Sequence, residues 1–249
     1  MLPPSPTHTN TQRTKHTPTS HLQQVSSQKY ITSVQSSVFC ARKSIYFLPA
    51  HACCFRVFST GTHNEAALKE GRAAYLKIEH LDARLTDLGK QQCATLKATK
   101  HGIEKEAELV VVSPLTRAIQ TAMLTIDQVE GVPWVALECV RERAGAHPCD
   151  RRRCVSELQG EYPDISFDAI KDEKDVLFDS LGEEREPNDL MADRGRELLS
   201  WLKDRPETNI AVVTHSAFLM CLFNEAMQAA PETAKWFRNC ELRSVFLEL

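Results

Sequence analysis

The sequence predicts an α/β fold in three layers, with a mostly parallel sheet flanked by helices. Two continuous runs of apolar and β-branched residues carry this prediction, AELVVVSPL at 107–115 and NIAVVTHS at 209–216. Such runs are typical of parallel strands that are covered on both faces. Helical segments alternate with these strands, which favours a parallel sheet. We therefore expect functional residues at the carboxyl ends of the strands.

Shorter β-prone segments add further strands. SIYFL at 44–48 and CCFRVF at 53–58 are alternatives for the first strand, and VPWVALE at 132–138 is another strand. Residues 242–249 alternate loosely between apolar and polar positions, which predicts an edge strand.

Helical periodicity marks five segments. It is clear in LTDLGKQQCATLKATK at 85–100, where Thr86 is the expected N-cap. The other helical segments are 64–79, 116–126, 190–202 and 217–229. The stretch from Arg141 to Pro187 is long and polar, so we expect an irregular excursion there.

Residues 1–43 are rich in Ser, Thr, Gln, His and Pro and show almost no apolar periodicity. Such a segment cannot offset its ordering entropy by burial, so we predict a disordered tail before a domain at 44–249. The many hydroxyls and the absence of acidic residues also fit an organelle transit peptide. We expect a cytoplasmic protein, or a mitochondrial or chloroplast one if the tail directs import.

The net charge of −3 hides an asymmetry between the tail and the body. All 33 acidic residues lie from Glu65 onward, and six of the 30 basic residues precede it, so the remainder carries 24 basic and 33 acidic residues, a net charge of −9. Such a body has no broad attraction for nucleic acid or anionic membranes. No apolar run approaches the roughly 20 residues that span a bilayer, so we expect a soluble protein.

Nine cysteines are scattered without regular spacing, which favours free thiols in a reducing compartment. The segment His147–Cys154, HPCDRRRC, suggests zinc, but two Cys and one His lack a convincing fourth ligand. No glycine-rich phosphate loop occurs either. We therefore expect no metal and no cofactor.

Polar side chains follow both buried strands. VVVSPLTRAIQT places Ser113 at one strand end and Arg117 in the first turn of the next helix, and VVTHS places His215 at the other strand end. Alone, an Arg on a helix is usually solvated, and a His after an apolar strand is usually a hydrogen-bonded core residue. Together at one sheet edge, with a helix N-terminus, they suit a small doubly charged anion such as phosphate.

These motifs resemble those of the histidine phosphatase superfamily, which has the phosphoglycerate mutase-like fold. SPLTRAIQTA and VVTHS resemble its second-Arg and second-His motifs, LTDLGKQQ its LTxxGxxQ signature, and GTHN the end of its opening RHGxxxxN motif. LECVRERAGAHPCDRR resembles the acidic segment of the plant, algal and fungal phosphoglycerate mutase-like branch. The motifs follow the family's order from about residue 61 to the C-terminus.

The resemblance implies hydrolysis of a phosphorylated small molecule through a phosphohistidine. It assigns Asn64, Arg117 and His215 to phosphate binding, with His215 also catalytic. It assigns Glu142 to the acid that protonates the leaving oxygen, with Glu138 as the alternative.

The opening motif lacks its nucleophile. Counting back from Asn64, the family pattern puts the nucleophilic His at Phe58 and its partner Arg at Val57, and neither side chain can perform that chemistry. His63 and His51 are candidate substitutes, but the first stands five positions late and the second seven positions early.

This gap leaves several hypotheses open. An incorrect or alternative first exon would explain why the resemblance stops abruptly before Gly61. The chain as written is then an impaired hydrolase or a non-catalytic phosphate-binding pseudophosphatase. Phosphoglycerate mutase activity is less favoured, because the loop at 143–187 departs from that of glycolytic mutases. Misfolding is a further hypothesis, because loss of the first, central strand would leave its neighbours with unpaired edges.

Overall fold

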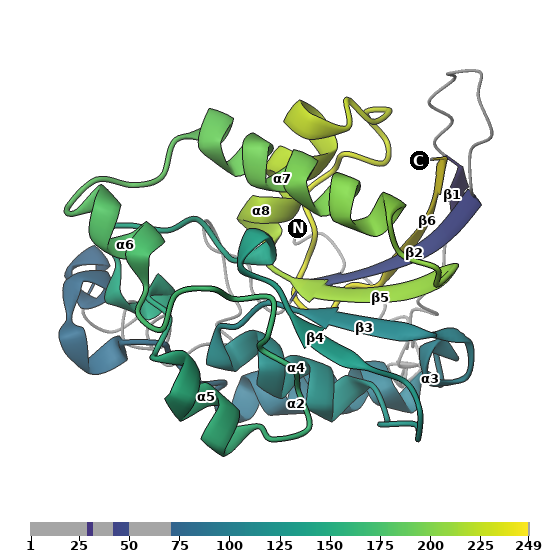
Figure 1. Cartoon of the computed structure of the whole chain (residues 1–249), viewed down its shortest axis with the longest axis horizontal. Helices are drawn as coiled ribbons and strands as arrows, with labels where there is room; N and C mark the ends of the chain where they lie inside the picture. The colour runs from purple at the N-terminus through teal and green to yellow at the C-terminus, as the bar shows by residue number, and fades with distance from the viewer. Residues whose placement is uncertain (1–28, 32–41, 50–70, 249) are drawn as a thin grey trace, which may run out of the picture.

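The computed structural model describes residues 29–31, 42–49 and 71–248. They form a six-stranded sheet in the order β1-β6-β2-β5-β3-β4, between two layers of helices (Figure 1). Neighbouring strands run parallel except β2 and β6, so the expected three-layer, mostly parallel architecture is confirmed. The strands are β1 Lys29–Ile31, β2 Arg42–Pro49, β3 Leu109–Val112, β4 Trp134–Ala136, β5 Asn209–Thr214 and β6 Arg243–Glu248.

Helices α7 and α8 cover one face of the sheet, and α2, α4 and α5 cover the other (Figure 1). The α-helices are α2 Asp87–Ala98, α3 Ile103–Glu106, α4 Thr116–Thr125, α5 Val155–Glu161, α6 Val176–Leu181, α7 Asn188–Lys203 and α8 Ser216–Cys221, which continues into the π-helical turn η5 Leu222–Ala226. The 3₁₀ turns are η1 Arg72–Leu76, η2 Ile78–His80, η3 Glu138–Val140 and η4 Pro148–Asp150. No helix in these described stretches is long and apolar enough to cross a membrane.

Successive side chains of a strand point to opposite faces of the sheet, so the sheet separates two apolar cores. Leu109 and Val111 of β3 pack with Leu198 of α7, whereas Val110 and Val112 pack with Ile119 of α4. Each buried side chain of this size contributes roughly 1.5–3 kcal/mol through removal of apolar surface from water. The continuous apolar runs therefore reflect a sheet with two covered faces.

Strand β2 lies at the centre of the sheet. It pairs in parallel with β5, with Pro49 opposite Thr214, and antiparallel with β6. The segment at 44–48 is thus a strand, but it is the second along the chain, because β1 precedes it. The alternative at 53–58 lies outside the described residues. The misfolding hypothesis assumed that this strand is lost, and β2 contradicts that assumption.

The outer strands differ from the sequence prediction. Strand β6 is not an edge strand, because β1 pairs with its Ser244–Phe246 stretch. Residues 29–31 and 42–43 of the segment predicted to be disordered are therefore strand residues, and the rest of 1–43 lies outside the described residues. β1 is too short for a period of two to show in the sequence.

Helix predictions succeed where periodicity is long. Thr86 caps α2 as expected, since its hydroxyl accepts a hydrogen bond from the Gly89 N–H at 3.1 Å. The described part of the predicted 64–79 helix is instead the two turns η1 and η2, because Gly71 has a left-handed φ of 78° and Lys77 is extended. The predicted irregular excursion contains α5 and α6, which are too short to establish a helical period.

Candidate active site

Two strand ends meet at the candidate site. Strands β3 and β5 pair with Val112 opposite Val213, so Ser113 and His215 emerge side by side. His215 is fully buried, and its Nε2 lies 2.8 Å from the Ser113 Oγ. The predicted convergence of these two strand ends is present in the structure.

Arg117 occupies the first turn of α4 and is completely buried. Its Nη1 donates to the carbonyl of Cys149 at 2.6 Å, and its Nη2 donates to Asp150 Oδ1 at 2.7 Å. A guanidinium has five N–H groups, so these two bonds leave capacity for another acceptor. Its buried Nε has no hydrogen-bond partner among the described residues.

Glu142 follows η3 and is 1% exposed. The Thr214 hydroxyl donates to the Val140 carbonyl at 2.5 Å, which ties this segment to the end of β5. Glu142 Oε1 accepts from the Arg143 N–H at 2.8 Å, whereas its buried Oε2 has no partner within the described part of the chain. Burial and then the charge of Asp150 raise the pKa of Glu142, which favours a protonated acid.

Glu138, the alternative acid, is already engaged. Its two carboxylate oxygens accept hydrogen bonds from Arg141 and from Arg152, the latter at 3.0 Å. Both oxygens of Glu138 are therefore already engaged by guanidinium groups, whereas Glu142 keeps one oxygen without a partner among the described residues.

A long connection between β4 and α7, residues 137–187, carries Glu142 and is held by buried arginines. Arg141 donates to both oxygens of Asp175, at 2.7 and 2.6 Å, and both side chains are fully buried. Arg194 of α7 binds Glu186 in the same bidentate manner, at 2.8 and 2.7 Å. These bonds fix the connection against the body of the protein.

Asp150 is the centre of a charged cluster that also contains Arg117 and Arg185. Its Oδ1 accepts from Arg117, and its Oδ2 accepts from Arg185 Nη1 at 2.9 Å. Arg185 also donates to the Gly145 carbonyl at 2.7 Å. Gly145 has a φ of 81°, and a Cβ there would lie 2.0 Å from the Glu184 carbonyl oxygen, so only glycine fits this close approach.

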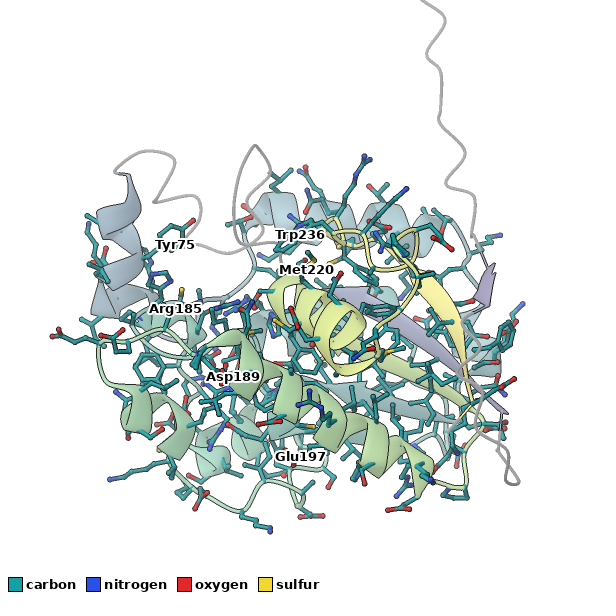
Figure 2. All side chains as sticks on the ribbon, turned by 90° about the horizontal axis from the view of Figure 1, so that it is seen from above. Tyr75, Arg185, Asp189, Glu197, Met220 and Trp236 are labelled. Carbon is teal, nitrogen blue, oxygen red and sulfur yellow. The ribbon has the colours of Figure 1, made fainter. Side chains whose placement is uncertain are left out.

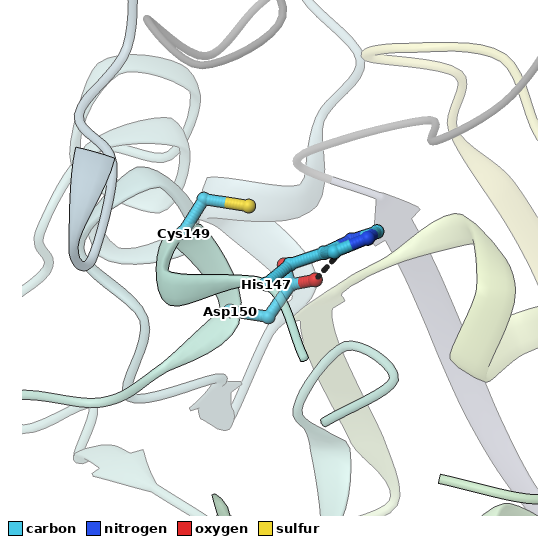
Figure 3. Close-up of side chains that lie close together, drawn as sticks. All are labelled: His147, Cys149 and Asp150. Atoms are coloured by element: carbon cyan, nitrogen blue, oxygen red, sulfur yellow. Dashed lines mark ion pairs between the residues drawn. The ribbon is translucent and has the colours of Figure 1, made fainter. Parts of the chain in front are cut away.

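His147, Cys149 and Asp150 bring a nitrogen, a sulfur and a carboxylate oxygen within 4.8 Å of one another (Figure 3). His147 Nδ1 lies 4.0 Å from Asp150 Oδ2, and burial followed by the charge of Arg185 lowers the pKa of His147. Both Asp150 oxygens already hold guanidinium groups, whose positive charges oppose a cation at the same place. The charge distribution therefore fits an ion-pair centre better than a metal centre.

Sequence reasoning missed two members of this cluster. Asp150 was considered only as part of a zinc-like segment, and Arg185 had no signal, because the two are 35 positions apart in the sequence. Five residues considered for the opening motif lie outside the described residues: His51, Val57, Phe58, His63 and Asn64.

Comparisons with known proteins bear on the family to which the chain is similar. The family model of the histidine phosphatase superfamily (branch 1) matches residues 68–247. Phosphoglycerate mutase-like protein 1 of Arabidopsis thaliana is 34% identical over 221 residues, which cover 75% of this chain and 77% of that protein. Phosphoglycerate mutase-like protein 2 of the same plant is 33% identical over 248 residues, covering 75% and 71%.

One solved structure shares the fold at low sequence identity. The phosphoglycerate mutase of Bacillus anthracis is 13% identical, with a TM-score of 0.50, and the match covers 84% of this chain and 89% of that one.

Proposed function

We propose that this chain, which belongs to the histidine phosphatase superfamily, hydrolyses phosphomonoesters of small molecules through a phosphohistidine. Two observations carry the proposal: the charge of the buried Arg117 acts on the buried Glu142, whose pKa is raised, and the buried His215 follows Thr214, which is bonded to the segment that carries Glu142. Perturbed groups gathered in this way are typical of catalytic sites.

Each group has a separate role in the proposed reaction. Arg117 and His215 neutralise the charge on the phosphoryl oxygens as the bond to the leaving group breaks. Glu142 gives its proton to the leaving oxygen. Because the pKa of Glu142 is raised, the acid form persists to higher pH than usual and is lost as pH rises through that raised pKa.

The end of β2 bears on which residue is the nucleophile. Pro49 pairs with Thr214, directly before His215. In the sequence, His51 follows Pro49 by two positions, whereas Phe58 follows it by nine. This supports His51 over position 58 as the nucleophile. If His51 is the nucleophile, Ala50 stands at the position of its partner Arg, which supports slow turnover.

A non-catalytic phosphate-binding protein is the second candidate. It is favoured by Val57 and Phe58 at the positions counted back from Asn64. In that case Arg117 and His215 bind phosphate without transfer, and inorganic phosphate raises the melting temperature without turnover.

The test measures hydrolysis of p-nitrophenyl phosphate by the full chain and its variants. We expect His51→Ala and His215→Ala to lower kcat by at least about 10²-fold. His63→Ala is the matched control, because it removes an imidazole from the same sequence segment and should leave turnover unchanged. Loss of activity in His63→Ala but not in His51→Ala would reject the assignment.

Two repair variants separate the alternatives further. If His51 is the nucleophile, Ala50→Arg restores the missing guanidinium and raises turnover, while Val57→Arg with Phe58→His does not. The opposite result places the nucleophile at position 58 in the repaired chain. If neither repair nor the parent chain turns over substrate but phosphate still stabilises the fold, the binding function replaces the hydrolase.

A further inference from the structure

We infer that Asp150 is a positioning residue, which holds Arg117 ready for phosphate and keeps its charge away from Glu142. This inference rests on the proposed function, since it assigns a part of the same site. It concerns a residue that does not itself touch substrate.

The first argument is the way that one carboxylate joins two guanidinium groups. Asp150 is 2% exposed and binds the buried Arg117 through one oxygen and Arg185 through the other. The side chain of Arg185 is 26% exposed and lies on the same side of the molecule as Tyr75, ahead of α7 (Figure 2). Asp150 therefore links the interior arginine to the surface.

The second argument is that Arg117 has few other counter-ions. Glu142 and Asp82 are the other carboxylates whose charges reach it. Asp82 already accepts hydrogen bonds from the Thr116 N–H at 2.8 Å and from Arg153 Nε at 2.9 Å. Without Asp150, the positive charge of Arg117 would be uncompensated and would lower the pKa of Glu142. Glu142 would then lose the proton that the reaction needs.

The third argument concerns the charges that surround Glu142. Asp150 favours its neutral form, whereas Arg117 and Arg185 favour its ionised form. Among the described residues, the groups near it come from η4, α4, the segment before α7 and α8: Asp150, Arg117, Arg185 and Cys221. Arg194 of α7 donates to the Glu142 backbone carbonyl at 3.3 Å. Of these, Asp150 is the only carboxylate.

Two variants should move the pH dependence of turnover in opposite directions. Asp150→Asn removes a negative charge and leaves two guanidinium groups uncompensated, so the alkaline limb of the pH–kcat profile shifts to lower pH. Arg185→Gln removes a positive charge, so the same limb shifts to higher pH. A general loss of stability cannot produce shifts of opposite sign.

The same variants should separate in phosphate affinity. Asp150→Asn loses a charge-assisted bond to Arg117, and we expect the inhibition constant of inorganic phosphate to rise about 10- to 100-fold. Arg151→Gln is the matched control, because Arg151 is adjacent in sequence but pairs with Asp179 at 2.7 Å. It should change neither the pH profile nor the inhibition constant.

The experiment measures p-nitrophenyl phosphate turnover against pH, phosphate inhibition and melting temperature with the full chain. Unchanged profiles and inhibition constants in Asp150→Asn, with only a lower melting temperature, would overturn the positioning role. If Asp150→Asn fails to fold, the pH–kcat profile of Arg185→Gln is the deciding measurement. An alkaline limb that is unshifted, or that shifts to lower pH, rejects the inference.

A failure of the hydrolase proposal can be told apart. If the parent chain shows no turnover, phosphate should still raise its melting temperature, and that shift should vanish in Asp150→Asn while persisting in Arg151→Gln. Equal shifts in all three proteins would reject the positioning role alone. No shift and no turnover in the parent would reject both proposals.

Discussion

Strands β3 and β5, which end just before Ser113 and His215, are held in place by apolar packing. The β4–α7 connection, which carries Glu142, is held in place by buried ion pairs. All four residues of β3 are at most 2% exposed and lie between two apolar layers. The connection instead depends on the bidentate pairs of Arg141 with Asp175 and of Arg194 with Glu186. Apolar packing tolerates changes of pH, while a buried ion pair needs both charges and its geometry.

The largest expected effect is on the ion-paired region. Asp175→Ala leaves Arg141 as a buried charge without its bidentate partner, and we expect a loss of about 3–5 kcal/mol in the free energy of unfolding. Asp179→Ala is the control, because its pair with Arg151 is exposed, and it should cost no more than about 1 kcal/mol. Urea denaturation measures both, and equal losses would contradict the contrast.

That loss should depend on pH. Burial alone would raise the pKa of Asp175, but hydrogen bonds and the charge of Arg141 outweigh it and lower the pKa. A lowered folded-state pKa stabilises the protein above the unfolded value of about 3.9, and this contribution is lost as pH falls through the folded value. The difference between the parent chain and Asp175→Ala should therefore shrink as the solution is acidified below about pH 4.

A smaller effect is expected from the apolar region. Leu109→Ala removes a fully buried side chain from β3 and should cost about 3 kcal/mol, through lost transfer energy and a residual cavity. This cost should be the same at acidic and neutral pH, because no titrating group is removed. A cost that follows pH as in Asp175→Ala would show that the two regions are not held differently.

The smallest expected effect is a gain in the free energy of unfolding rather than a loss. A raised folded-state pKa stabilises below the unfolded value and loses that contribution as pH rises through the folded value, so ionised Glu142 costs stability at alkaline pH. Glu142→Gln should raise the free energy of unfolding there by up to about 1 kcal/mol while lowering activity. Glu157→Gln, on the exposed side of α5, should change neither.

The same contrast explains what could be predicted from the sequence. The β3 and β5 runs and the α2 cap follow from local composition, and the meeting of Ser113 with His215 follows from the rule that parallel strands end at one edge. The contacts of Asp150 with Arg185 and of Arg141 with Asp175 join residues more than 30 positions apart. No periodicity records such pairs, so the support of Glu142 became visible only in the fold.

The position of β2 also sets an order for folding. This strand is near the start of the chain, but both its partners, β5 and β6, are near the end. At synthesis rates of about 5–20 residues per second, roughly 10–30 seconds pass between the synthesis of β2 and that of β5, its first partner strand. The pairings of β2 therefore form only after residues 209–248 have been made, and a product that stops before residue 209 carries β2 with neither partner.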